Sequence, residues 1–584
     1  MCMKFSASTR AWTTPPRSAY QFLGAEQLQC CVSCGTRAAF ELERGESFLL
    51  LYCGEAMAVQ IETPQTQTKQ TDGEMDDKKA RCRQVRTTVA LMLSFIVEKA
   101  DEMILPAAYK FIGQSLNATP AQLGSITLTR ALVQALSSPI GGLLGDRLDR
   151  THIIAFGCFL WGVMTMAIGL STTLTQAMSF SAWNGLGLAL VIPCVQSLIA
   201  DVYSSTTRGR AFGLLFLTSG LGGMAGGFFA TSIGSQRPYG VEGWRFAFFV
   251  IAGISVMTGF LTLFMAADPR KGELRKCGTT RRECFGWLCQ RSREMARDIW
   301  LVLGVRSFQI IVLQGIVGTM PWVAMGFTTL YLQLLGFSDI KAATLVALFG
   351  LGCALGSFGG GYIGDMLTKV FPNSGRIMAA QFSVLMTFPC TMVIYKCLPV
   401  TATGGMDTMT LPYAAVFFFT GLLISWSGTN NSAMFAEIVP EQLRSAVYAF
   451  DRSFEGAVGA TAAPLVGLVA EKVFGFAGSL KAEAVPDPML QLANAHALGN
   501  AMLVLLLAPW GFDFIFYCGL YYTLPKDRER SRNLGRLLTY TVSDANLCEL
   551  GKLPAADSDS DVDSNLGKLS MPMKRSSNPT EFFS

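Results

Sequence analysis

The sequence predicts an all-α membrane protein of twelve transmembrane helices in two pseudo-symmetric halves of six. Three observations carry this prediction. Of the 584 residues, 51% are hydrophobic and only 15% are charged, whereas soluble domains carry about 25% charged residues. Apolar stretches close to the roughly 20 residues that a helix needs to cross a bilayer recur along the chain. Short motifs recur at matching places in the two halves.

These stretches divide the chain into five parts. Residues 1–84 are expected to be a disordered cytosolic tail or, because basic and hydroxyl residues precede the first acid, an organellar transit segment. A six-helix half at 85–267, a basic central loop at 268–300 and a second six-helix half at 301–525 follow, with a disordered tail at 526–584. The twelve expected spans are 85–112, 120–145, 153–170, 175–200, 211–234, 244–267, 301–335, 340–364, 377–396, 411–436, 446–470 and 495–524.

Lys and Arg gather in alternate loops between these spans. The loops after the second and fourth spans and the central loop are basic, whereas the intervening loops contain few basic residues. Positively charged loops stay on the cytosolic side, so we expect both termini and the central loop in the cytosol. The charge pattern leaves three membranes open: the plasma membrane, the vacuole or lysosome, and the plastid envelope.

The first repeated motif closes the second helix of each half. GLLGD at Gly142–Asp146 matches GYIGD at Gly361–Asp365. We expect Gly142 and Gly361 to let helices approach closely, and we expect the charged residues around them to act as a cytosolic gate. The gate residues are Asp146, Arg147, Arg150 and Asp365. Parallel repeats of this kind place the substrate between the halves, near the middle of the membrane.

The second repeated motif ends the fourth helix of each half. Asp201 is followed seven residues later by Arg208, and Glu437 is followed by Arg444 at the same spacing. We expect each acid to pair with its arginine as a cytosolic latch, a contact present in one conformational state only. Asp451, Arg452 and Glu455 at the start of the eleventh helix are either an interfacial ion network or a further gate.

Three stretches resemble the major facilitator transporters, and within them the spinster branch. PIGGLLGDRLDR at 139–150 resembles the superfamily's signature loop and ends in a pattern similar to that of spinster proteins. GLGLALVIPCVQSLIADVY at 185–203 and the segment 313–339 are similar to spinster-like members. The resemblance covers roughly 85–524 and implies twelve helices, alternating access and lipid-like substrates such as sphingoid bases, their phosphates or lysolipids.

Three positions depart from the pattern of that family. The family often carries Arg four residues before the first glycine of the GxG motif and Glu just after the second. Ser181 and Leu188 occupy these positions here. In the second signature loop, Met366 replaces the Arg after the acid. The missing charges put proton coupling of the family's type in doubt at this site.

The first helix carries Glu98, Lys99, Asp101 and Glu102 at its middle. A charge at the bilayer centre costs roughly 2.5–3.5 kcal/mol on insertion scales, so these side chains must face a partner or a wet cavity. At 1.5 Å per residue, Arg130 lies at the same depth. We therefore predict that Arg130 pairs with Asp101 or Glu102, and that these five residues form a substrate or ion site rather than a purely structural cluster.

Asp513 lies deep in the last helix with no partner nearby in the sequence. It is either a second substrate or ion site or a cap on a helix broken near Pro509 and Gly511. The 16 cysteines form no paired CxxC set, so neither a structural metal nor a cofactor is expected.

These features predict a secondary active or facilitative transporter, not an enzyme, for a small-molecule or lipid-like substrate. Acids in an apolar cavity suit a substrate with a cationic amine, and they equally suit a coupling proton or cation. A proton-coupled carrier of a sugar or organic anion is one alternative, and a membrane receptor or scaffold without transport is another. The small net charge of +5 and the absence of a basic patch interleaved with aromatic residues give no indication of nucleic-acid binding.

Overall fold

The computed structural model describes residues 37–43, 46–52, 64–203, 208–270, 293, 304–400, 406–438, 454–477 and 488–550. The chain divides into two compact units, Met1–Ala80 and Arg81–Ser584. Strands β1 (Arg37–Glu43) and β2 (Glu46–Tyr52) of the first unit form an antiparallel hairpin in which Arg37 pairs with Tyr52. This hairpin lies within the segment that the sequence analysis expects to be a tail.

The helices of the N-terminal half begin at clear capping signals. Thr119 and Gln122 form a capping box at the start of α4, with Pro120 as its first residue, and Asp149 accepts a hydrogen bond from the Thr151 N–H at the start of α5. These side chains satisfy N–H groups that have no partner inside the helix. The helices are α2 (Pro64–Ala107), α3 (Tyr109–Leu116), α4 (Pro120–Arg147), α5 (Arg150–Leu170), α6 (Leu174–Val202), α7 (Arg208–Gly234) and α8 (Gly243–Met265), with the short turn η2 (Pro238–Gly240).

Proline interrupts two spans of the C-terminal half. Pro321 lies in the last turn of α11 and Pro389 in the last turn of α14, where each removes the helical hydrogen bond to the carbonyl four residues earlier. An irregular turn follows each of these helices. The elements are α11 (Arg306–Ala324), η3 (Met325–Phe327), α12 (Thr328–Leu334), α13 (Asp339–Val370), α14 (Gly375–Met392), η4 (Val393–Cys397), η5 (Met406–Met409), α15 (Thr410–Ile424), α16 (Trp426–Ile438), α18 (Ala462–Lys472) and α19 (Pro488–Leu550). Helix α19 continues into the segment expected to be a C-terminal tail.

Nine helices in the described part of the chain are long and apolar enough to cross a membrane. The three other expected spans coincide with α2 and α3, with α4, and with α18. Helix α2 carries Glu98, Lys99, Asp101 and Glu102 in its apolar part, and α18 is 11 residues long. The all-α membrane fold is therefore confirmed, and the count of twelve stays a prediction.

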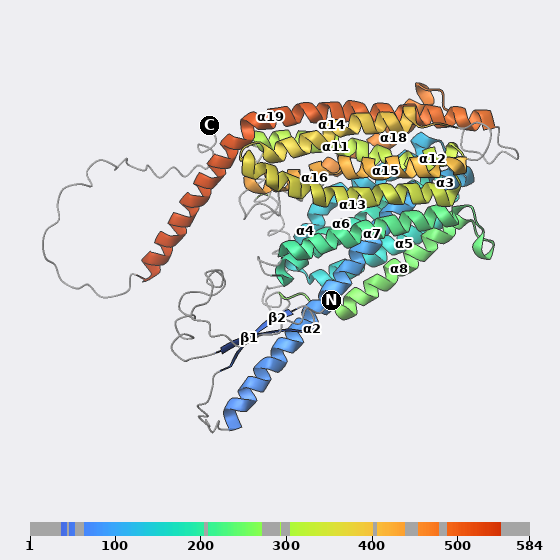
Figure 1. The fold of residues 1–584 in the computed structure, drawn as a ribbon. Helices are drawn as coiled ribbons and strands as arrows, with labels where there is room; N and C mark the ends of the chain where they lie inside the picture. Colours follow the sequence, from blue (N-terminus) through green and yellow to red (C-terminus); the bar gives the residue numbers. More distant parts are fainter. Residues whose placement is uncertain are drawn as a thin grey trace, which may run out of the picture. The chain divides into compact units, whose positions relative to one another are not determined.

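Within the second unit, the two halves meet along two helix pairs, α4 with α18 and α7 with α13 (Figure 1). A Cβ atom on Gly124 would overlap the backbone of Ala463, and one on Gly467 would overlap the backbone of Ala121. We call this backbone contact between α4 and α18 the seam. It lies near the first residues of α4, whereas Arg150 lies beyond the last residue of that helix. The seam thus joins the halves at the end of the bundle opposite Arg150.

Candidate functional site

Asp101 lies at the centre of a polar network that joins four helices of the N-terminal half. Its buried carboxylate on α2 accepts hydrogen bonds from Thr165 Oγ1 on α5 at 2.6 Å and from Asn184 Nδ2 on α6 at 3.2 Å. Arg130 Nη1 on α4 lies 3.8 Å from Asp101 Oδ2. One carboxylate therefore holds α2 against α4, α5 and α6.

The neighbouring charged residues of α2 form a more open set beside this network. Lys99 pairs with Glu102, and its Nζ lies 3.8 Å from Glu98 Oε1. The Lys99 side chain is 38% exposed, whereas that of Glu98 is 3% exposed. Three carboxylates face two cations, Lys99 and Arg130, so the fully ionised cluster carries one net negative charge.

This geometry agrees with the prediction made from helix depth. Arg130 pairs with Asp101, whereas Glu102 takes Lys99 as its partner. The sequence analysis does not identify Thr165 or Asn184 as members of the network, because a buried Thr or Asn on an apolar helix gives no signal of its own. The role of the cluster in transport stays a prediction.

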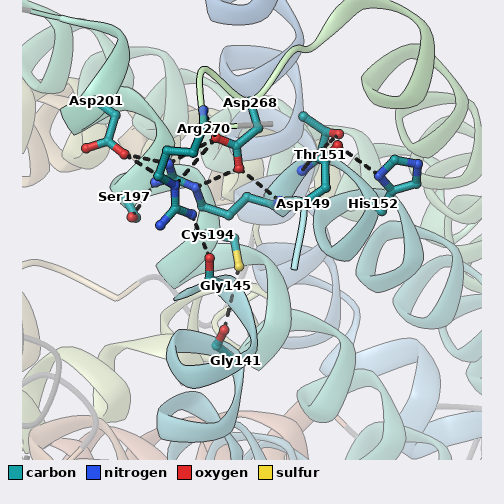
Figure 2. Close-up of polar contacts among 11 residues, drawn as sticks. Gly141, Gly145, Asp149, Thr151, His152, Cys194, Ser197, Asp201, Asp268 and Arg270 are labelled. Carbon is teal, nitrogen blue, oxygen red and sulfur yellow. Dashed lines mark hydrogen bonds and ion pairs between the residues drawn. The ribbon is translucent and has the colours of Figure 1, made fainter. Parts of the chain in front are cut away.

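Arg150 is the centre of a second cluster, at the end of the bundle away from the seam. Figure 2 labels Ser197, Asp201, Asp268 and Arg270 of this cluster. The fully buried guanidinium of Arg150 donates from Nε to Asp268 Oδ2 at 3.1 Å and from Nη2 to Asp201 Oδ2 at 2.5 Å. Nη1 donates to Ser197 Oγ at 2.6 Å. Arg270 adds a hydrogen bond to the Gly145 carbonyl at 2.7 Å. The cluster ties together the ends of α4, α5 and α6 and the segment after α8.

The Asp268 carboxylate is held in its charged form by this cluster. Burial alone would raise the pKa of Asp268, but hydrogen bonds from Arg150 and from the Arg270 N–H lower that pKa below its usual value. The hydrogen bonds from the buried Arg150 to the ionised Asp268 are therefore strong charge-assisted contacts.

The C-terminal half has a corresponding but more open cluster. Arg376, at the start of α14, lies 2.8 Å from Asp365 Oδ1 and 3.4 Å from Glu437 Oε1. Arg528 on α19 lies 2.5 Å from Glu437 Oε2. In both halves, an arginine at the start of the third helix therefore binds the acid that ends the fourth. The acids of the second repeated motif, Asp201 and Glu437, thus form matching ion pairs.

The acids of the two predicted latches bind other arginines within the described part of the chain. Asp201 pairs with Arg150, and Glu437 pairs with Arg376 and Arg528. Several of the charged residues predicted at this end of the bundle lie outside the described part of the structure. They are the side chains of Asp146, Arg147 and Arg208 and the residues Arg444, Asp451 and Arg452. The latch pairs with Arg208 and Arg444 therefore lie outside the described residues.

The charged residues that follow the sixth helix of each half are further members of these clusters that were not predicted from the sequence. These are Asp268 and Arg270 after α8, and Asp527 and Arg528 in the corresponding part of α19. Asp527 accepts a hydrogen bond from the Ser307 N–H at 2.8 Å. The recurrence of an Asp close to an Arg at the two matching places was a detectable signal.

The expected close approach at Gly142 and Gly361 is shifted by one residue. A methyl group on Gly142 would meet no atom within 4 Å, and one on Gly361 would make only ordinary contact with Thr429. Gly141 instead lies against the Ala189 carbonyl, and Gly360 lies against the Trp426 ring. One residue corresponds to about 100° around a helix, so a motif match alone does not specify the contacting face.

Asp513 lies beside a cavity of about 370 Å³ in the C-terminal half. The cavity is lined by α11, α13, α16 and α19, and by Glu455 of the helical segment 454–459. Asp513 and Glu455 are 2% and 7% exposed. The Glu455 carboxylate lies inside the bundle against Gly315, while Asp451 and Arg452, the other members of the expected network or gate, lie outside the described residues. No group of His, Cys, Asp and Glu suited to a metal ion occurs in the described part of the chain.

Two helical halves joined at one end, with buried ionisable groups between their helices, define a membrane protein of the transporter class. The chain matches the Major Facilitator Superfamily over residues 91–460 and belongs to that family. The protein spinster of Drosophila melanogaster is 25% identical over 347 residues, which cover 58% of this chain and 53% of that protein. The chain thus matches about half the length of this relative.

Two further comparisons support the assignment. The probable L-galactonate transporter of Escherichia coli strain K12 is 24% identical over 406 residues, covering 67% of this chain and 84% of that one. A solved bacterial homologue of the human lysosomal transporter Spinster, inward-facing and unoccupied, matches with a TM-score of 0.61 at 19% identity, covering 76% of this chain and 98% of that one. The resemblance to the spinster branch is confirmed.

Proposed function

We propose that the protein carries a lipid-like amphiphile with a cationic amine, such as a sphingoid base or lysolipid, across its membrane by alternating access. The observation that carries this proposal is the set of ionisable side chains on α2 and α4, buried inside an apolar bundle. Such groups are costly in a membrane and are functional candidates by default. A cluster with a net negative charge and a partly open edge at Lys99 and Glu102 suits a positively charged head group.

The arrangement of the halves supports a defined state of the transport cycle. The seam joins the halves at one end, and Lys110 Nζ lies 3.2 Å from Asp339 Oδ1 across the halves near that end. We place the opposite end, which carries Arg150 and the basic loops, in the cytosol because positive loops remain there. The described conformation is then inward-facing, as is the solved bacterial homologue of Spinster.

Flux into proteoliposomes tests the proposal. Labelled sphingoid bases and lysolipids are supplied with and without an inward proton gradient, using the wild type, Asp101→Asn and the control Glu242→Gln. Glu242 lies just before α8 and pairs with Arg245. We expect amphiphile flux that falls at least about tenfold in Asp101→Asn, because Arg130 loses its counter-charge, and that is unchanged in Glu242→Gln. A response to the gradient would show proton coupling.

The same assay separates the alternative functions. No flux of any amphiphile by folded protein would contradict the proposal. A proton-coupled carrier of a sugar or organic anion is the second candidate, favoured by the match to the probable L-galactonate transporter over most of that protein's length. Labelled galactonate in the same proteoliposomes tests it. A protein that moves neither class would be a receptor or scaffold.

A further inference from the structure

The described residues that line the cavity beside Asp513 all belong to the C-terminal half. They come from 311–513, and the cavity volume of about 370 Å³ falls within the range typical of small-molecule sites. Gly315 and Gly318 on α11 lie about 14 and 18 Å along the axis from Arg306, the first residue of that helix. This depth is close to the middle of a hydrocarbon core about 30 Å thick. The cavity therefore lies at the depth in the membrane at which a substrate would bind between the halves.

Two glycines make room for two carboxylates on the same face of α11. The Glu455 carboxylate occupies the space that a side chain at position 315 would fill, and Asp513 Oδ2 lies 3.4 Å from where a Cβ at Gly318 would stand. Residues three apart on a helix are neighbours on its surface, with Cβ atoms about 5–6 Å apart. The carboxylates of Glu455 and Asp513 thus lie about one helical turn apart, facing one cavity.

A chain of hydrogen bonds fixes the orientation of Asp513. The Tyr517 hydroxyl donates to Asn431 Oδ1 at 2.7 Å, and Asn431 Nδ2 donates to Gln314 Oε1 at 2.7 Å. The Gln314 amide in turn hydrogen-bonds Asp513. All donors of this chain point toward the carboxylate, so Asp513 is held as an acceptor.

Two polar atoms of the cavity wall have unused bonding capacity. Asp513 Oδ1 and Ser425 Oγ are buried and make no hydrogen bond within the described part of the protein. No Lys or Arg is among the described residues that line the cavity. A buried carboxylate oxygen without a donor costs free energy, which a bound cation would recover.

We propose that Asp513 and Glu455 form a binding site for an organic ammonium group. Trp322 and Trp510 line the same cavity, and an aromatic face attracts a cationic amine. Ser425 provides a hydroxyl for an ammonium N–H. The volume exceeds that needed for one bare metal ion, so the chemistry fits an amine joined to an organic body. The site rests on the proposed function only in that its ligand would be the transported amphiphile's head group.

Binding to full-length protein in lipid nanodiscs tests the site without transport. Octylamine and 1-octanol are titrated by calorimetry, with empty nanodiscs subtracted. We expect saturable binding of octylamine and none of 1-octanol. Affinity for octylamine should fall about 10- to 100-fold in Asp513→Asn and in Glu455→Gln, the loss expected for one charged hydrogen bond. Glu242→Gln, an acid removed elsewhere, should bind like the wild type.

The outcomes separate this proposal from the transport proposal. Equal binding of octylamine and 1-octanol, undiminished affinity in both variants, or competitive displacement of octylamine by sodium ions would overturn the ammonium site. The wild-type comparison decides even if a variant fails to fold. Octylamine binding that depends on Asp513, together with no flux of any amphiphile, would retain the site and reject transport. Amphiphile flux that Asp513→Asn leaves unchanged would do the reverse.

Discussion

The two halves share their helix order but differ in how they hold buried charge. In the N-terminal half, Asp101 is surrounded by donors and a cation on three other helices. In the C-terminal half, Asp513 and Glu455 face a cavity whose described lining contains no cation. In the first arrangement the Asp101 carboxylate is held by donors and a cation and links helices, whereas in the second Asp513 Oδ1 remains an acceptor for a ligand. We infer that Asp101 holds the helices of the N-terminal half together, and that the C-terminal cavity adds a second site for the head group in addition to the open edge at Lys99 and Glu102.

The largest expected effect comes from removing Arg130 from the network around Asp101. Arg130→Ala leaves Asp101 as a buried charge without its counter-ion, so we expect the free energy of unfolding to fall by about 3–5 kcal/mol. The measurement is unfolding of the reconstituted protein by sodium dodecyl sulfate, with Arg130→Lys as a control that keeps the charge. A loss below about 1 kcal/mol would show that the pair is not a structural link.

Asp268→Asn tests the Arg150 cluster through its pH dependence. Because the pKa of Asp268 is lowered in the folded protein, its contribution is complete at neutral pH. That contribution is lost only as the pH falls through the lowered pKa, below the ordinary value of about 3.9. We expect Asp268→Asn to cost about 1.5–3 kcal/mol, constant from about pH 8 to 5.

Thermal unfolding midpoints across this pH range measure the effect. Glu437→Gln is the matched variant in the C-terminal half, where the acid is 24% exposed, and it should cost less than Asp268→Asn. An equal loss in the two variants would remove the difference between the halves at this end of the bundle.

Asp513→Asn should change stability far less than Arg130→Ala. The substitution removes a buried charge whose Oδ1 has no donor within the described structure, and the amide keeps the shape of the side chain. We expect a change below about 1 kcal/mol in either direction, because relief of charge burial offsets any lost hydrogen bond. The same detergent titration applies. A loss above about 2 kcal/mol would place Asp513 in a structural ion pair and end the comparison.

The smallest effect is expected between the halves. Lys110 and Asp339 are 28% and 14% exposed, and partly exposed pairs contribute about 0–1 kcal/mol. Lys110→Ala should therefore change the initial rate of flux less than about fivefold, and high salt should reduce the difference by screening. Flux measured at low and high ionic strength tests this. A larger change that persists at high salt would make the pair a major determinant of the closed state.

Hydropathy and internal repeats predict the fold because both can be recognised from the order of residues along the chain, without knowledge of side-chain packing. The bilayer requires long apolar helices, and two matched halves place matched motifs at matched depths. Depth alone predicted that Arg130 pairs with Asp101 or Glu102, because the rise per residue is constant, and the structure shows Asp101 as the partner. Membership of the cluster beyond charge was not predictable, since Thr165 and Asn184 are ordinary polar residues until the helices pack.

The contact partners of other charged side chains were not predictable from the sequence. Arg150 was expected in a gate, but its contact with Asp268 depends on where the chain turns after α8. Glu455 was expected near the membrane surface, yet it lies beneath Gly315 because that glycine leaves space for a carboxylate. Rotation about a helix axis decides such contacts, and one residue changes the facing direction by about 100°.

The seam has a consequence for electrical leakage. At Gly124 and Gly467 the backbones of α4 and α18 touch without side chains between them, so a hydrated ion finds no polar path there. Each elementary charge crossing a membrane releases about 2.3 kcal/mol per 100 mV, and even rare slippage would dissipate the membrane potential. The close backbone contact at Gly124 and Gly467 thus limits ion leakage between the halves, and the charged clusters lie elsewhere in the bundle.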